Sequence, residues 1–268
     1  MLKSIIKRFW PVSIHTFNTK IDALQNNINI QMNKLKEEPK EEPKEEPDEN
    51  YLHPDAPLRT IASQENWPKL LSSKWNAKNI KVLEIGSRVV TGSSFKHWFA
   101  KADYVGFDYY AGENVDVVGD AHKLSSYFKP DEKFDLIFST AVFEHFAMPW
   151  VVAQEITKML KVGGELLIET HYAHTIHERP WHFFHFTDMA LKVLFSSAMG
   201  FECIEAGFSN PLVARFSNQS ADYLKNLPVL GLYCHVGYYG KKVQHIDNFE
   251  WNCIDLPKIV DNTHYPKI

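Results

Sequence analysis

In Val82-Leu83-Glu84-Ile85-Gly86-Ser87-Arg88-Val89-Val90-Thr91-Gly92, an apolar run leads directly into a glycine turn. A short apolar run that ends at a glycine is typical of a buried strand, and residues 91–101 after it predict a helix. Gly86 allows the backbone to approach a ligand closely, and a following helix start favours an anionic group. The unit is a candidate binding turn, although many strand–turn–helix units bind nothing.

The same alternation of strand and helix continues along the chain. Pro149 opens a second helix that Gly163 is expected to end, and Thr187 caps a third that ends at Gly200. Including the strand before Gly86, apolar runs predict strands over residues 80–85, 104–107, 115–118, 134–139, 165–169, 201–204 and 232–239. This pattern indicates an α/β, doubly wound, mostly parallel sheet with helices on both faces. Ligands of such sheets lie at the carboxyl ends of the strands.

Acidic residues stand at two of those ends. Asp108 follows the second strand about 20 residues after the glycine turn, where a carboxylate accepts hydrogen bonds from two ribose hydroxyls. Asp120 follows the third strand, where an adenine amino group would be met. Each acid has an alternative interpretation as a helix cap or a solvated turn residue.

Five motifs in this order resemble the class I S-adenosylmethionine-dependent methyltransferases, the group that includes many small-molecule and sugar O-methyltransferases. The resemblance covers residues 79–205, about half the chain. The motifs are Leu83-Glu84-Ile85-Gly86-Ser87-Arg88, Tyr104-Val105-Gly106-Phe107-Asp108, Val115-Asp116-Val117-Val118-Gly119-Asp120-Ala121-His122, Phe143-Glu144-His145 and Leu160-Lys161-Val162-Gly163-Gly164.

The resemblance implies a Rossmann-like sheet of seven strands in the order 3-2-1-4-5-7-6, with the last strand antiparallel. It also implies S-adenosyl-L-methionine as the cofactor, lying along the tips of strands one to four. The residues implied to bind it are Glu84, Gly86, Ser87, Asp108, Tyr109, Asp120, Ala121, His122 and Ser139. A dinucleotide oxidoreductase is the rival, but its pyrophosphate needs two or three spaced glycines, and this turn has only Gly86 before Gly92.

A histidine is the candidate catalytic base. Methyl transfer to a hydroxyl needs the proton removed as the oxygen attacks, and histidine is the usual base. His145 follows the fourth strand, and similar sugar O-methyltransferases use a histidine there. The alternative is that Glu144-His145 braces the loop or lines the cofactor pocket.

Residues 145–185 hold six of the thirteen histidines, among several aromatic residues. The family often reads Pro-Trp-Asp-Tyr-Trp-Arg-Phe-Thr here, whereas this chain reads Pro180-Trp181-His182-Phe183-Phe184-His185-Phe186-Thr187. We interpret the region as a wall of the acceptor pocket, with plain packing and a metal site as alternatives. The spacing matches no standard zinc motif, so no metal ligand is predicted. The candidate substrate-binding residues are His171, Tyr172, His174, His177, Trp181, His182 and His185.

These features predict an O-methyltransferase that acts on a sugar or nucleotide-sugar acceptor in surface-glycan biosynthesis. Methylation of a nitrogen, a carbon or a lipid-linked acceptor is the alternative within enzymes. A non-catalytic cofactor-binding scaffold is the rival class, because the family commonly has an acid where this chain has Ala141. The net charge of -4 argues against a nucleic-acid partner. Three scattered cysteines are expected to be reduced and buried in a cytoplasmic protein.

Composition divides the chain into three parts. Residues 1–35 carry five basic residues against one acid and are expected to form a helical arm. Residues 2–10 are apolar on one side and basic on the other, which predicts contact with the inner membrane surface, with a frayed terminus or docking on a partner as the alternatives. The heptad-like apolar spacing after Pro11 predicts a helix that self-associates or packs on its own domain. Residues 36–50 repeat Lys-Glu-Glu-Pro and predict an extended linker. Residues 51–268 are expected to form the methyltransferase domain, with residues 51–78 as a helical cover.

Overall fold

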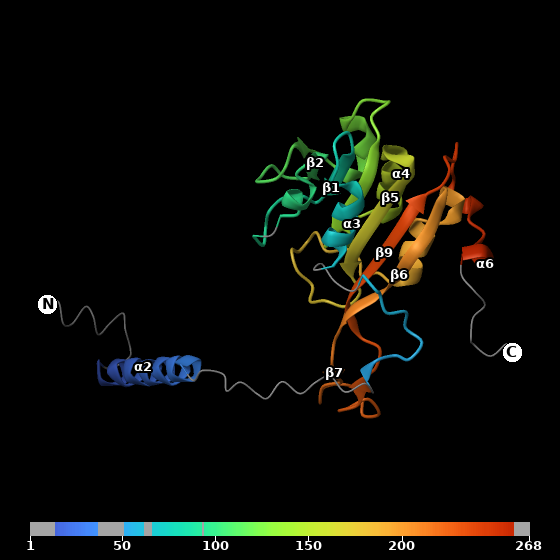
Figure 1. Cartoon of the computed structure of the whole chain (residues 1–268). Helices are drawn as coiled ribbons and strands as arrows, with labels where there is room; N and C mark the ends of the chain where they lie inside the picture. Colours follow the sequence, from blue (N-terminus) through green and yellow to red (C-terminus); the bar gives the residue numbers. More distant parts are fainter. Residues whose placement is uncertain (1–13, 37–50, 62–65, 93, 260–268) are drawn as a thin grey trace. The chain divides into compact units, whose positions relative to one another are not determined.

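The computed structural model describes residues 14–36, 51–61, 66–92 and 94–259 (Figure 1). Its internal contacts divide the chain into two units, Met1–Glu46 and Pro47–Ile268. In the first unit, helix α2 spans Ile14–Lys36 and leaves Ile21, Leu24 and Ile28 exposed. The amphipathic segment at residues 2–10 and nearly all of the Lys-Glu-Glu-Pro repeat lie outside the described residues. No described helix is both long enough and apolar enough to cross a membrane.

The second unit is built on a sheet of seven strands in the order β3-β2-β1-β4-β5-β9-β6. Strand β9 is antiparallel to both of its neighbours, and the other pairings are parallel. Numbered within this sheet, the order is 3-2-1-4-5-7-6, which confirms the prediction. The strands are β1 (Lys81–Ile85), β2 (Asp103–Asp108), β3 (Val117–Val118), β4 (Phe134–Thr140), β5 (Leu160–His171), β6 (Phe201–Pro211) and β9 (Tyr233–Lys242).

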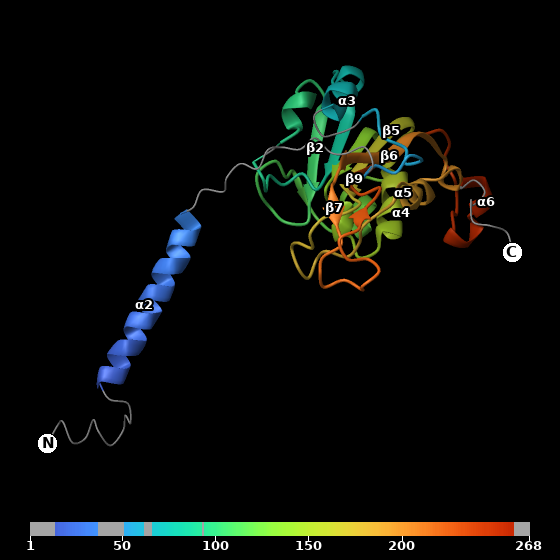
Figure 2. The same ribbon diagram turned by 90° about the horizontal axis from the view of Figure 1, so that it is seen from below.

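Helices cover both faces of this sheet (Figures 1 and 2). On one face, α3 (Trp67–Trp75) and η2 (Lys96–Phe99) pack onto Val82 and Phe138, with Trp67 fully buried. The other face carries the larger core, over which lie η3 (Ala121–Tyr127), α4 (Pro149–Met159) and α5 (Asp188–Leu194). The doubly wound architecture is therefore confirmed, and α3 supplies the helical cover expected before the first strand.

Three predicted elements are wrong in detail. The helix capped by Thr187 ends at Leu194 and not at Gly200, which instead caps the short helix η5 (Ser197–Met199). The helix expected over residues 91–101 is reduced to η2, because Gly92 has φ +84° and serines, which favour caps and turns over helix interiors, follow it. Gly163 does not end a helix, since α4 stops at Met159 and β5 begins at Leu160. Leu160 pairs with Phe134 across an irregularity in the ladder, and Gly163, with φ +89°, lies within the strand.

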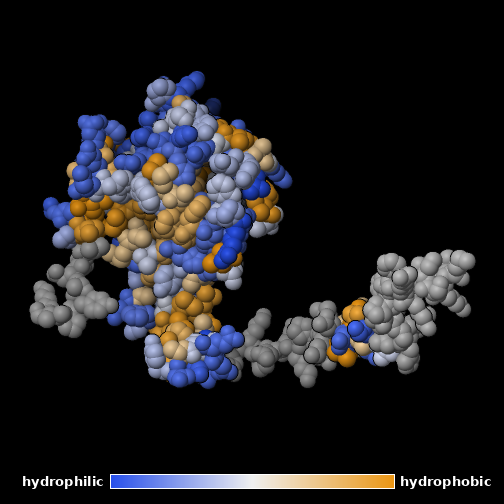
Figure 3. Space-filling view, turned by 180° about the vertical axis from the view of Figure 1, so that it is seen from behind, coloured by the Kyte–Doolittle hydropathy of each residue, from blue (hydrophilic) through white to orange (hydrophobic). Residues whose placement is uncertain are grey.

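The remaining elements are short. A separate two-stranded sheet joins β7 (Ala214–Arg215) to β8 (Pro228–Val229), and exposed apolar side chains gather around it (Figure 3). The other short helices are η4 (Phe143–His145), η5 (Ser197–Met199), η6 (Trp251–Cys253) and α6 (Leu256–Ile259). The three cysteines are free, but the expectation that they are buried is wrong, because Cys203 and Cys253 are exposed.

Candidate functional site

The turn after β1 requires its glycine. Gly86 has φ +82°, and a Cβ there would overlap the side chain of Val142. The backbone N–H of Gly86 donates to the carbonyl of Phe107 at 2.8 Å, which fastens the turn to the end of β2. Both the left-handed conformation and the close neighbour exclude a larger residue.

Asp108 ends β2 beside this turn. Its Oδ1 accepts the N–H of Tyr110 at 2.9 Å, and its Oδ2 accepts the N–H of Arg88 at 3.3 Å. The Arg88 Nε lies 3.5 Å from Oδ1. Each carboxylate oxygen keeps a lone pair for a further donor, and the side chain is 14% exposed. Asp108 is therefore held in place by hydrogen bonds and can still accept one hydrogen bond from each hydroxyl of a diol.

Asp120 lies at the end of β3 and caps η3. Its Oδ1 accepts the N–H of His122 at 3.0 Å and lies 2.7 Å from Nδ1 of the same residue. Partial burial opposes ionisation, but these contacts with His122 lower the pKa of Asp120 below its ordinary value. The Nε2 of His122 accepts the N–H of Met148, which ties the strand end to α4. Ala121 is buried between them.

Three of the predicted cofactor residues turn their side chains into the fold. The carboxylate of Glu84 accepts a hydrogen bond from Tyr104, while Ser139 is fully buried and donates to the carbonyl of Ile85 at 2.9 Å. Ser87 is also buried, and its hydroxyl donates to the carbonyl of Asn114 at 2.9 Å. At these positions only the backbone is free to face a ligand.

Asn114 is a residue that the sequence interpretation missed. It has φ +68°, and its Nδ2 donates to the carbonyl of Ser87 and to the Tyr104 hydroxyl, each at 3.0 Å. Through these hydrogen bonds, Asn114 holds the loop after β2 against the turn after β1. The available signal was its residue type, since asparagine adopts the left-handed conformation more readily than most residues.

A second group of polar residues gathers where β4 and β5 end. Glu144 in η4 is fully buried, with Oε1 2.9 Å from Nδ1 of His171 and Oε2 accepting the Thr170 hydroxyl at 2.7 Å. Burial alone would raise the pKa of Glu144, but the contacts from His171 and Thr170 outweigh it and lower the pKa to about 2. Glu144 is therefore a buried anion, whereas the sequence interpretation considered it only as a brace of the loop or a wall of the cofactor pocket together with His145.

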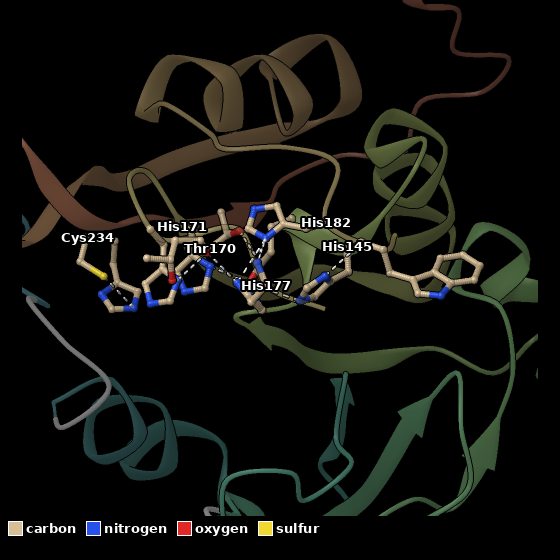
Figure 4. A network of polar contacts seen from close by, with 11 residues as sticks. His145, Thr170, His171, His177, His182 and Cys234 are labelled. Carbon is tan, nitrogen blue, oxygen red and sulfur yellow. Dashed lines mark hydrogen bonds and ion pairs between the residues drawn. The ribbon is translucent and has the colours of Figure 1, made fainter. Parts of the chain in front are cut away.

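The loop after β5 folds back over this anion. The N–H of Phe183 donates to the carbonyl of Glu144 at 2.8 Å, and the N–H of Phe186 donates to the carbonyl of His171 at 2.9 Å. These bonds bring His182 next to His177, with their Nδ1 atoms 3.2 Å apart. Figure 4 shows the labelled histidines in one row beside Thr170.

His145 has a defined tautomer. Its Nδ1 lies 2.8 Å from the carbonyl of Trp181, and because a carbonyl only accepts, Nδ1 carries the proton. In a neutral imidazole Nε2 is then the nitrogen with the lone pair, and it lies 3.8 Å from Oε1 of Glu144. The side chain of His145 is 20% exposed.

Of the other predicted acceptor residues, three are exposed and one belongs to the core. His174 is exposed and stacks on His171 with ring centroids 4.3 Å apart, and His185 contacts the ring of His182. Trp181 is about half exposed and lies 6.1 Å from the ring of Tyr109. Tyr172 instead packs against the buried Phe208 and belongs to the core.

His235 is a further member that the sequence interpretation missed. It pairs with His171 in the β5–β9 ladder, and the ring centroids lie 5.4 Å apart. Burial, together with the nearby histidines, lowers the pKa of His235 to about 4. No local signal marks it, because its partner stands more than sixty positions earlier in the chain.

A family model described as a methyltransferase domain matches residues 61–209, more than half of the chain. The chain belongs to this methyltransferase family. The cofactor of the methyltransferase is S-adenosyl-L-methionine. No curated protein matches the chain.

Solved structures resemble the methyltransferase at low identity. The YcgJ protein of Bacillus subtilis is 17% identical with a TM-score of 0.47, over 68% of this chain and all of that chain. The plantazolicin methyltransferase BamL, in complex with a triazolic desmethylPZN analogue and SAH, is 18% identical with a TM-score of 0.46, over 66% and 84%. A SAM-dependent methyltransferase from Aquifex aeolicus is 15% identical with a TM-score of 0.42, over 66% and 89%.

The hydrogen-bond acceptors at the sheet edge suit this cofactor. Asp108 retains an acceptor lone pair on each carboxylate oxygen, as a ribose diol requires, and Asp120 is ionised beside it in the sheet. S-adenosylmethionine has no phosphates, so a turn with Gly86 as its single glycine before Gly92 is sufficient. Arg88, which neighbours Asp108, is the one cation in the turn.

Proposed function

We propose that the methyltransferase transfers a methyl group to a hydroxyl of a sugar or similar hydroxylated small molecule in surface-glycan biosynthesis, with His145 as the base. The observation that carries the proposal is the contact of Nδ1 of His145 with the carbonyl of Trp181 at 2.8 Å, which leaves Nε2 free to accept a proton. A base of this kind suits a hydroxyl acceptor, which must lose its proton as it attacks.

Asp108, Asp120 and the backbone of the turn at Gly86 are the groups proposed to hold the cofactor. When bound, S-adenosylmethionine would supply a methyl group on a sulfonium, with S-adenosylhomocysteine as the leaving group when a nucleophile attacks the methyl carbon in line. The contribution of the chain is to bring the two reactants together, which is worth up to about 7–11 kcal/mol of the barrier.

In the proposed step, His145 takes the proton that the acceptor hydroxyl loses. The acceptor oxygen forms the new carbon–oxygen bond as the methyl–sulfur bond breaks, and the bonding pair stays on sulfur. The hydroxyl proton passes to Nε2 of His145. Glu144 lies 3.8 Å from that nitrogen, so the imidazolium that results is stabilised by a buried anion.

The acceptor is proposed to lie against the loop after β5. Trp181 offers an exposed aromatic face, and His174, His177, His182 and the neighbouring His185 offer ring nitrogens for hydroxyl groups. The sugar assignment is supported by the resemblance of Pro180–Thr187 to the family pattern and by this mixture of aromatic and hydrogen-bonding groups.

Cofactor binding tests the first half of the proposal. We expect Asp108→Ala to weaken S-adenosylmethionine binding by about tenfold or more in calorimetry, because the charge-assisted hydrogen bonds of a carboxylate are worth roughly 1.5–3 kcal/mol. Asp103→Ala is the matched control, since Asp103 begins the same strand and its side chain is exposed. A folded wild-type protein that binds no cofactor would contradict the proposal.

Turnover tests the second half. In methyl transfer to a panel of nucleotide-activated sugars, we expect His145→Ala to lower kcat by about 100- to 10,000-fold while cofactor affinity is retained. His97→Ala, on the opposite face of the sheet, should leave kcat unchanged. Unchanged turnover in His145→Ala would remove His145 from the role of base.

A further inference from the structure

We propose that His171, His174 and His177 bind one divalent transition-metal ion, with zinc as the reference ion. Each offers one imidazole nitrogen, and these three ligand atoms all lie within 4.8 Å of one another. Imidazole nitrogens bind zinc at about 2.0–2.1 Å, so small side-chain rotations bring the three onto a single ion.

The fold, rather than a sequence motif, brings these residues together. His171 is the last residue of β5 and is held by the ladder to β9, while His174 and His177 lie in the loop that follows. The N–H of Tyr172 donates to the carbonyl of Cys234 at 2.9 Å, which fixes the start of that loop. The spacing i, i+3, i+6 on irregular backbone is absent from the standard zinc motifs, so the sequence alone predicted no ligand.

Each of the three imidazoles has an acceptor near its Nδ1. The Nδ1 of His171 lies 2.9 Å from Oε1 of Glu144, and the Nδ1 atoms of His174 and His177 each lie 3.1 Å from the carbonyl of Thr175. A neutral imidazole with its proton on Nδ1 suits such acceptors and has its lone pair on Nε2. A metal-binding histidine typically has such a partner on its second nitrogen.

The charge at the site also favours a cation. Glu144 is fully buried, and its Oε1 lies 2.9 Å from Nδ1 of His171, so a cation bound to that imidazole would have a carboxyl group directly behind it. Three imidazoles with a single acid behind them suit zinc, copper, iron or nickel rather than magnesium or calcium, which prefer oxygen ligands.

A second set of candidate ligands shares one member with the first. Glu144, His145 and His177 also place their ligand atoms within 4.8 Å. Glu144, however, is engaged by His171 and Thr170, and ligation by Nε2 of His145 would occupy the nitrogen proposed as the base. We therefore assign the ion to the three-histidine set.

An ion with three protein ligands keeps an open position, as catalytic zinc sites do. His174 is exposed, so that position is reached from solvent. If the function proposed above holds, an ion held by these residues would supply a Lewis acid for the acceptor hydroxyl, in place of direct hydrogen bonds from His174 and His177, and His145 would still take the proton. The existence of the site does not depend on that function.

Metal binding by the full chain tests the inference directly. After removal of metal with a chelator, we expect calorimetry with zinc chloride to show one equivalent bound, and cobalt(II) to give the visible absorption of a nitrogen-ligated ion. His174→Ala should weaken zinc binding at least about tenfold, and Glu144→Gln by about 10–100-fold as the loss of a supporting carboxylate. His245→Ala is the control, since His245 is equally exposed but lies after β9.

The variants separate the two ligand sets. Retained zinc binding in His145→Ala and lost binding in His174→Ala would support the assignment, and the reverse pattern would overturn it. Less than one equivalent in the folded wild-type protein would also overturn it. Calorimetry with S-adenosylmethionine on the same preparation distinguishes this failure from a failure of the proposed function.

Discussion

Glu84 shows how a single residue of the sheet departs from ordinary carboxylate behaviour. It is the last residue but one of β1, is almost fully buried, and accepts hydrogen bonds from Tyr104 and, at 3.5 Å, from Asn114. Burial raises the pKa of Glu84 to about 7, because the two hydrogen bonds only partly offset the loss of solvation. Above that pH, the fold carries a desolvated anion beside the cofactor turn.

A pH dependence follows from this shift. The folded protein retains a proton on Glu84 that the unfolded chain has released above its ordinary pKa of 4.5. The free energy of unfolding should therefore fall by up to about 3 kcal/mol as the pH rises from 4.5 through 7. Denaturant unfolding of the wild type and Glu84→Gln at pH 5 and pH 8 checks this, because the difference between the two isolates Glu84 from the histidines. An equal pH response in both proteins would contradict it.

Strands β5, β9 and β6, at one side of the sheet, are all contacted by an arginine that precedes the sheet in the chain. The N–H of Arg59 donates to the carbonyl of Phe208 at 3.0 Å, and Nη1 of its fully buried guanidinium lies 3.4 Å from Oε2 of Glu169. Burial lowers the pKa of Arg59, with Glu169 and Glu205 opposing the shift. Gly237 on β9 leaves the room for this side chain, since a Cβ there would overlap Nη1 of Arg59.

A double-mutant cycle measures this fit between elements. Gly237→Ala should destabilise the fold by about 1–3 kcal/mol through overpacking, and Arg59→Ala by about 3–5 kcal/mol through loss of a buried ion pair. Because truncation of Arg59 removes the overlap, the double variant should be more stable than the sum predicts by about 0.5–3 kcal/mol. Simple additivity in denaturant unfolding would show that Gly237 has another role.

On the scale of the whole molecule, the chain consists of two units with different surfaces. Helix α2 leaves apolar residues exposed at the spacing that predicted self-association or packing of the helix on its own domain. The second unit begins near Tyr51, which is buried and whose carbonyl accepts the N–H of Gly231 at 2.6 Å. The catalytic proposal involves residues of the second unit only.

Two truncations test this division. Deletion of residues 1–50 should leave the melting temperature of the domain and its affinity for S-adenosylmethionine unchanged, since every proposed cofactor group lies beyond it. Deletion of residues 1–59 removes Tyr51 and Arg59, and should lower the melting temperature sharply. Differential scanning calorimetry and cofactor titration check both, and a loss of cofactor binding in the shorter deletion would place part of the site in the first unit.

Local pattern accounts for most of the fold. Apolar runs of strand length predicted the parallel sheet, and the acids at their ends predicted the shared edge on which Asp108 and Asp120 lie. The order of the strands was predicted from the family resemblance. These features depend on neighbouring residues, so they can be recognised along the chain. The helix expected over residues 91–101 failed because Gly92 adopts a left-handed conformation, and Gly163 failed as a helix end because pairing with Phe134 draws Leu160 into a strand.

The histidine-rich end of the molecule was only partly visible in the sequence. Local composition marked His145 and the loop from His171 to His185 as a candidate site, since residue type alone shows where chemistry is available. The structure added the buried anion Glu144, the tautomer of His145, the hydrogen bond from Asn114 to Ser87 and the pairing of His235 with His171. Each depends on a contact between segments far apart in the chain, and such contacts exist only after the sheet has assembled and excluded water from the groups that it buries.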